Sequence, residues 1–166
     1  MEKTILGNDL EICRILNGMW QVAGGHGQID SKLAIQEMQK YQELGFTTWD
    51  LADIYGPAES LIGDFNKKDE HDFQAFTKFV PNPGPMSNSI VTYYIEESLK
   101  KMNLKCIDLL QFHWWDYHDS SYLDALQHLS KLQNEGKIKY LGLTNFDTKR
   151  IKIIIEKGFK IISNQV

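Results

Sequence analysis

The feature that most restricts the fold of this chain is a repeated unit in which an amphipathic helical segment is followed by an apolar, strand-like segment. In one unit, apolar residues recur at three and four positions across 34–44, after a capping Asp30 or Ser31. A glycine then ends the helix, and the aromatic and β-branched residues 46–49 follow as a strand. Repetition of this unit predicts six strands that alternate with five helices. Strands joined through helices are parallel, with right-handed crossovers.

A β/α barrel explains this repeat better than an open, doubly wound sheet. The predicted strands are residues 16–20, 46–49, 73–79, 106–113, 140–145 and 160–166. Nearly every one of them ends in a polar residue, and these residues are Asp50, Lys78, His113, Asn145 and Gln165. In a doubly wound sheet only strands at the switch point need such residues, whereas all strand ends of a barrel converge on one mouth.

We therefore expect an α/β fold of the (β/α)8 TIM-barrel type that is incomplete, with about six of the eight units, since a full barrel needs about 250 residues. The β/α units occupy residues 16–166. Before them, residues 3–15 predict a β-hairpin with a turn at 7–9, which resembles a plug or lid. The whole chain, 1–166, is expected to be one domain.

Composition and charge exclude several classes of protein. The chain has 166 residues, of which 42% are hydrophobic, so it can bury one core. Its formal charge of -4 argues against a nucleic-acid partner, and no apolar run is long enough for a membrane helix. Nothing near Met1 resembles a signal peptide, so we expect a cytoplasmic protein. Cys13 and Cys106 lack metal-ligand spacing and predict free core thiols.

The predicted strand ends bring an acid, a phenol, a lysine and a histidine to the barrel mouth. A tyrosine has an unperturbed pKa of about 10, so Tyr55 donates a proton near neutrality only if its phenolate is stabilised. We expect the Lys78 ammonium to stabilise it and Asp50 to hold that lysine in place. His113 would then orient a substrate carbonyl. Because this set lacks a nucleophile, its missing partner is most simply a hydride donor.

Tryptophans predict the walls of this site. Trp20 ends the first predicted strand, and Trp114 and Trp115 directly follow His113. All three are candidate apolar walls for a bound substrate.

Some of these residues are also compatible with structural roles or with a different reaction. Lys78 can be a strand-end lysine whose stem covers apolar surface, and Asn145 can be a helix cap. His113, Asp116 and His118 allow a metal-assisted hydrolase, although their spacing matches no ligand motif such as HExxH, and we expect no metal.

Several segments in the same order resemble the aldo-keto reductase superfamily, whose members are β/α barrels that reduce aldehydes and ketones with NADPH. The segments are WDLADIYG with the following PAESLIG, FTKF, LLQFHWWD, GLTNFD and the final SNQV. They span almost all of the chain. The resemblance implies a small carbonyl substrate and NADP as cofactor, with NAD as the alternative.

The resemblance also implies roles for individual residues. Those that correspond to the catalytic tetrad are Asp50, Tyr55, Lys78 and His113, with Tyr55 as the general acid. Those that would hold the nicotinamide carboxamide are Thr144, Asn145 and Gln165. Thr144-Asn145 stands where many members carry Ser-Asn, and the hydroxyl is kept.

A barrel that stops after its sixth strand departs from the family pattern, and we expect a truncated member. In the family, the missing part supplies an aromatic that stacks on nicotinamide and a basic loop for the adenosine phosphates. Open strand edges also invite pairing with another chain. The alternative function is therefore a catalytically silent partial barrel that acts as an interaction or assembly module, and oligomers could form through these edges.

Overall fold

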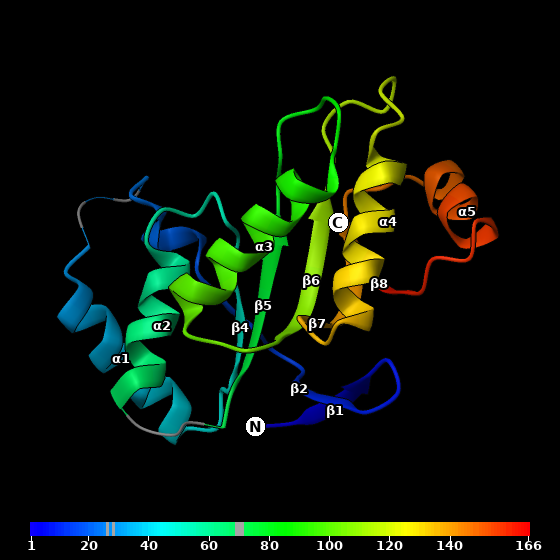
Figure 1. Cartoon of the computed structure of the whole chain (residues 1–166). Helices are drawn as coiled ribbons and strands as arrows, with labels where there is room; N and C mark the ends of the chain where they lie inside the picture. The colour runs from blue at the N-terminus through cyan, green and yellow to red at the C-terminus, as the bar shows by residue number, and fades with distance from the viewer. Residues whose placement is uncertain (26, 28, 69–71) are drawn as a thin grey trace.

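The computed structural model describes residues 1–25, 27, 29–68 and 72–166 (Figure 1). Its main feature is one sheet of six parallel strands in the order β3-β4-β5-β6-β7-β8. These strands are β3 (Asn17–Gly18), β4 (Thr48–Asp50), β5 (Gln74–Phe79), β6 (Ile107–His113), β7 (Ile138–Thr144) and β8 (Ile161–Gln165). Among the described residues, β3 and β8 are the sheet edges and do not pair with each other.

Helices connect successive strands. They are the 3-10 helix η1 (Trp20–Ala23) and the α-helices α1 (Ser31–Glu43), α2 (Ala58–Lys68), α3 (Asn88–Met102), α4 (Tyr122–Asn134) and α5 (Thr148–Glu156). The predicted alternation of six parallel strands with five α-helices is thus confirmed, as an incomplete barrel. No described helix combines the length and apolar character that crossing a membrane requires.

The first α-helix shows how local sequence sets the boundaries of the elements. Asp30 caps α1 by accepting hydrogen bonds from the backbone N–H groups of Lys32 and Leu33. At the other end, Gly45 has a φ of 84°, and the Phe46 N–H donates to the Tyr41 carbonyl, as in a Schellman motif. Because Phe46 is used in this way, β4 begins only at Thr48, two residues later than predicted.

A hairpin precedes the barrel, as predicted, and lies at the end where the strands begin (Figure 1). It pairs β1 (Lys3–Leu6) with β2 (Leu10–Cys13) in antiparallel register. Leu10 and Ile12 of the hairpin pack against Phe76 and Leu109 of the sheet. The Tyr140 hydroxyl fastens the turn by donating to Asp9, at 2.8 Å. The hairpin therefore plugs one end of the barrel.

Successive side chains of β5 point alternately to the core beneath the helices and to the interior of the barrel. Ala75 and Phe79 belong to the main core beneath the helices, whereas Phe76 faces the hairpin cluster. Lys78 shares the inward face with Phe76 because successive side chains of a strand point to opposite faces. The interior is therefore apolar near the hairpin and polar at the opposite end, where the strands stop.

The two cysteines differ in their burial. Both cysteines are free, as predicted, but Cys13 is buried and Cys106 is partly exposed, so only Cys13 is a core thiol.

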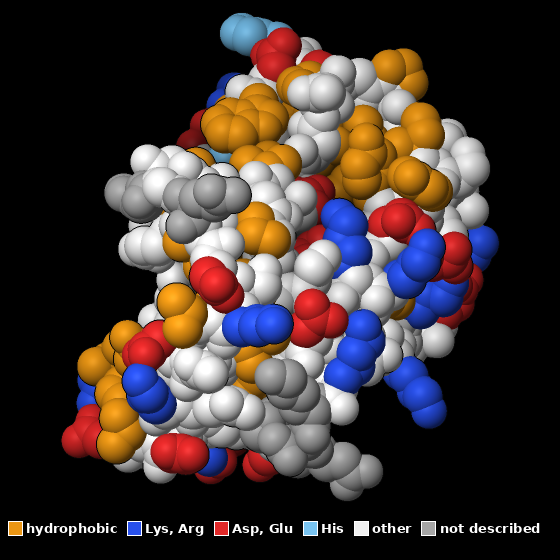
Figure 2. Space-filling model, turned by 90° about the vertical axis from the view of Figure 1, so that its left-hand side faces the viewer, with side chains coloured by type: hydrophobic (Ala, Val, Ile, Leu, Met, Phe, Trp, Pro, Cys, Tyr) orange, Lys and Arg blue, Asp and Glu red, His pale blue; other side chains and the backbone are white. Residues whose placement is uncertain are grey.

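Figure 2 shows basic and acidic side chains intermixed over the face it presents. Ion pairs within helices include Lys67–Asp64 on α2 and Lys100–Glu97 on α3.

We predict that Gly63→Ala destabilises the fold. Gly63 lies where α2 meets α3, and a Cβ there would overlap the carbonyl oxygen of Lys101. Separating the helices should cost about 1–3 kcal/mol of unfolding free energy, measured by urea denaturation. Gly25→Ala is the matched control, because a Cβ there meets nothing within 4 Å. Equal stability of the two variants would show that the helices separate without cost.

Candidate active site

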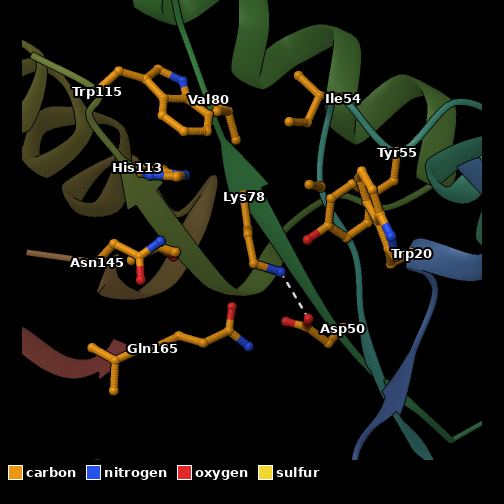
Figure 3. A pocket seen from close by; sticks show the side chains of 13 residues that line it. Trp20, Asp50, Ile54, Tyr55, Lys78, Val80, His113, Trp115, Asn145 and Gln165 are labelled. Carbon is orange, nitrogen blue, oxygen red and sulfur yellow. Dashed lines mark hydrogen bonds and ion pairs between the residues drawn. The ribbon is translucent and has the colours of Figure 1, made fainter.

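A cavity of about 430 Å³ opens at the carboxyl ends of the parallel strands (Figure 3). The sequence-predicted residues that line it are Trp20, Asp50, Tyr55, Lys78, His113, Thr144, Asn145 and Gln165. Trp115, also predicted as a wall, lines it too, and Ile54 and Val80 complete most of the rest. Strand ends that are far apart in the sequence thus meet around a single space, which is what the barrel geometry requires.

Lys78 and Asp50 form a buried ion pair in this cavity, drawn as the dashed line in Figure 3. The Lys78 Nζ donates to Asp50 Oδ2 at 2.8 Å and to the Leu51 carbonyl at 2.7 Å. The lysine is only 4% exposed. Burial lowers the pKa of Lys78, although the Asp50 charge acts in the opposite direction. The pair therefore fixes a positive charge beside the predicted acid.

Gln111 is a site residue that the sequence prediction missed. Its Nε2 donates to Asp50 Oδ1 at 2.9 Å, so each oxygen of the carboxylate has its own partner. Gln111 is 3% exposed and belongs to β6. The available signal was a polar residue two positions before His113 in an apolar strand, which places both on the same face.

Tyr55 lies beside the ion pair, on the loop that follows β4. The Lys78 Nζ is 5.0 Å from the centre of its ring, and the Trp20 ring packs edge-on at 5.0 Å. Burial and the Asp50 charge raise the pKa of Tyr55 above its ordinary value. These two effects outweigh the stabilisation of the phenolate that is expected from Lys78, whose ammonium is held by Asp50 and the Leu51 carbonyl.

His113 ends β6 on the opposite side of the cavity from Tyr55 (Figure 3). Its ring packs on Trp115, with 4.1 Å between ring centres. Burial and the positive charge of Lys78 lower the pKa of His113. The imidazole is consequently neutral at neutral pH, and it can donate one hydrogen bond while accepting another.

The tryptophan walls require one correction. Trp20 and Trp115 line the cavity, but Trp114 is 1% exposed and does not. Its Nε1 donates to the backbone carbonyls of Asp116 and Asp119, at 2.7 and 3.1 Å. Side chains on extended backbone alternate in direction, so Trp114 points to the core between two residues that face the cavity.

The predicted cofactor residues lie at the ends of β7 and β8. The Thr144 hydroxyl oxygen is buried and has no hydrogen-bond partner among the residues that the structure describes. Asn145 has a φ of 60°, in the left-handed region, and its N–H donates to the Gln165 carbonyl at 2.8 Å. In Figure 3 the Gln165 side chain extends toward Asp50. This corner of the cavity is therefore lined by an unpartnered hydroxyl and two residues with carboxamide side chains.

The alternative metal residues are not assembled into a ligand set. The carboxylate of Asp116 accepts a hydrogen bond from the His118 N–H, and His113 packs on Trp115. Within the described part of the chain, no three His, Cys, Asp or Glu side chains are grouped to hold a metal ion.

Six parallel strands that alternate with five α-helices in the described chain, with a cavity at their carboxyl ends, place this protein in the β/α barrel class. Residues 14–166 match the profile described as "Aldo/keto reductase family". This match covers most of the chain, so the chain belongs to the aldo/keto reductase family.

Individual relatives agree with this assignment. A 6-dehydroglucose reductase from Agrobacterium fabrum is 30% identical over 167 residues, covering 88% of this chain and 54% of the relative. The methylglyoxal reductase DkgA from Escherichia coli O157:H7 is 28% identical over 153 residues, covering 90% of this chain and 54% of the relative. The chain thus spans about half the length of these relatives.

Solved structures share the fold. The thermostable aldo-keto reductase Tm1743, in complex with the inhibitor epalrestat, superposes with a TM-score of 0.85 at 24% identity. All of this chain and 62% of that chain are covered. The Bombyx mori aldo-keto reductase AKR2E4, in complex with NADP, gives a TM-score of 0.80 at 20% identity, covering 98% of this chain and 57% of that chain.

We predict that Lys78→Met strongly destabilises the protein. The substitution leaves the mostly buried Asp50 charge without its cation, which costs about 3–5 kcal/mol in buried pairs. Urea denaturation at neutral pH measures the change. The double variant Asp50→Asn/Lys78→Met is the control, because it removes the uncompensated charge and should recover part of the loss. A single variant as stable as the double variant would contradict this prediction.

Proposed function

We propose that this chain is an NAD(P)H-dependent oxidoreductase that reduces an aldehyde or ketone to an alcohol by hydride transfer, with Tyr55 as the general acid. The main support is that one cavity is lined by Asp50, Tyr55, Lys78 and His113 in a chain of the aldo/keto reductase family. NADPH is the proposed cofactor and NADH the alternative. A relative of this fold, AKR2E4, has NADP in its structure.

Tyr55 and His113 act on the carbonyl oxygen in this proposal. Tyr55 gives its phenolic proton to that oxygen as the alcohol forms. A phenol of ordinary pKa, about 10, is already protonated at neutral pH, so the donor is present before the reaction starts. The neutral His113 donates a hydrogen bond to the same oxygen and orients it. Lys78 supplies a fixed positive charge where negative charge develops on the oxygen.

The corner formed by Thr144, Asn145 and Gln165 fits a carboxamide. A carboxamide has two N–H donors and a carbonyl acceptor, so it complements one hydroxyl and two amide side chains. The buried Thr144 oxygen in particular lacks a partner that a ligand amide would supply. These three residues would hold a nicotinamide ring, which supplies the hydride when bound.

The remaining wall favours a small carbonyl substrate. Trp20, Ile54, Val80 and Trp115 surround the space beside Tyr55 and His113 (Figure 3). Apolar walls with few polar groups are typical of sites for small molecules.

A second candidate function is that of a catalytically silent assembly module. It is favoured by the sheet edges β3 and β8, since β8 is partly exposed along all five of its residues. Exposed edges can pair with strands of another chain. This candidate predicts oligomers and no carbonyl reduction, whereas the reductase proposal predicts turnover that depends on Tyr55.

We predict that Tyr55→Phe lowers kcat for NADPH-dependent reduction of a small aldehyde by about 10²–10⁴, because the general acid is removed. Absorbance of NADPH measures the rate, and NADPH fluorescence measures binding, which should not change. Tyr93→Phe is the matched control, since Tyr93 is exposed on α3 and does not line the cavity. Near-full turnover in Tyr55→Phe would exclude Tyr55 as the acid.

We predict that Thr144→Val weakens NADPH binding about 2–10-fold, which corresponds to one hydrogen bond. Protein stability should not fall, because the buried hydroxyl has no partner to lose. Fluorescence titration measures affinity and thermal unfolding measures stability. Thr144→Ser keeps the hydroxyl and should bind as the parent does. Unchanged affinity in the valine variant would remove Thr144 from the cofactor site.

A further inference from the structure

Asp53 ties the loop that carries Tyr55 to the end of β5. Its backbone N–H donates to the Lys78 carbonyl at 3.1 Å, and its carboxylate Oδ2 accepts from the Val80 N–H, also at 3.1 Å. The loop therefore stays bonded to this end of the sheet beyond the last residue of β4. Lys78 and Val80 both line the cavity.

This tie sets the position of Tyr55. The Tyr55 N–H donates to the carbonyl of Ala52 at 3.0 Å, which closes a tight turn around Asp53. Ala52 and Ile54, the neighbours of Asp53 in the chain, both line the cavity. A shift of Asp53 away from β5 would consequently move the phenol relative to Lys78.

Two buried carboxylate oxygens near this tie lack hydrogen-bond partners. One is Asp53 Oδ1, and the other is Oε2 of Glu59, a residue of α2 that is 2% exposed. Glu59 Oε1 accepts from the Thr77 hydroxyl at 2.7 Å. The Lys101 Nζ of α3 lies 3.5 Å from Glu59 Oε2. Glu59 Oε2 therefore has a cation beside it, and Asp53 Oδ1 is the costly unpartnered oxygen that needs a physical cause.

Charge around Asp53 supplies that cause. Burial raises the pKa of Asp53 to about 6, and the charge of Glu59 adds to the effect. The Val80 N–H and Lys101 act in the opposite direction. The charged groups that face Asp53 are Glu59 of α2, Lys78 of β5 and Lys101 of α3. A proton on the Asp53 carboxyl removes its repulsion with Glu59.

We propose that Asp53 is a positioning residue, which clamps the Tyr55 loop to the end of β5, and that protonation of its carboxyl stabilises the folded chain. Its effect on catalysis rests on the proposed reductase function, whereas the clamp itself does not. Because the pKa of Asp53 in the folded chain lies above the ordinary value of 3.8, the folded state binds the extra proton between these values. Stability therefore falls as pH rises through this window.

Hydrogen exchange tests the clamp. Asp53→Ala should speed amide exchange of residues 51–57 and of Val80 about tenfold, because the acceptor of the Val80 N–H is lost. Asp108→Ala is the matched control. The Asp108 carboxylate accepts from the Ala75 N–H at 3.0 Å near the start of β5, so its loss should leave residues 51–57 unchanged. Equal exchange of residues 51–57 in both variants would overturn the clamp.

Thermal unfolding against pH tests the role of the proton. Asp53→Asn keeps an acceptor for Val80 and is neutral at every pH, so it mimics the protonated form. Its Tm should exceed that of the parent near pH 7.5, and the difference should shrink as the pH falls below 6 and vanish near pH 3.8. A difference that does not change with pH would overturn the proton dependence, and so would a parent that is equally stable at both pH values.

Kinetics test the effect on the reaction. Asp53→Ala should lower kcat about tenfold or more with little change in KM for NADPH, and Asp53→Asn should restore it and flatten the pH dependence of kcat near pH 6. A kcat in Asp53→Ala equal to that of the parent would overturn the positioning role. If the parent itself shows no turnover, the proposed function fails, while exchange and unfolding still decide whether the clamp exists.

Discussion

The buried contact between Lys78 and Asp50 is the interaction on which the mouth of the barrel depends. A charged lysine tolerates burial only when its charge is paired and its N–H groups are bonded, and here Asp50 and the Leu51 carbonyl meet both needs. Gln111 occupies the remaining carboxylate oxygen. The position of this one ammonium then influences Tyr55 and His113, which both lie around it in the cavity.

The rest of the fold keeps this polar end separate from the core. The hairpin fills the opposite end of the barrel with Leu10 and Ile12, and these pack on Phe76 and Leu109 of the strands that carry the site. Strand alternation then turns Lys78 and Gln111 toward the mouth. A single strand can therefore contact the apolar hairpin near its start and the polar cavity near its end. Each residue step moves a side chain about 3.2–3.4 Å along the strand, so a few residues separate the two environments.

Much of the fold and most of the cavity could be predicted from the sequence, for reasons that particular residues show. Helical spacing, Asp30 as a cap and Gly45 as a stop are local signals, and parallel strands follow from them. The direction in which a side chain points and the burial around it are not set by its neighbours in the sequence. The burial of Trp114 in the core depends on the backbone after β6, and the raised pKa of Tyr55 depends on burial and on Asp50. Gln111 was missed because its partner lies 61 residues away.

The sequence by itself determined the barrel class, the polar strand ends and the family resemblance, because periodicity and motif order are written in neighbouring residues. Only the tertiary structure decided which tryptophans face the cavity and that the Asp50 carboxylate bonds to both Lys78 and Gln111. It also decided that Asp53 joins its loop to β5. Each of these depends on which distant groups come within hydrogen-bonding distance and on how much water packing removes. Burial and electrostatic fields are properties of the folded chain as a whole, so no short segment specifies them.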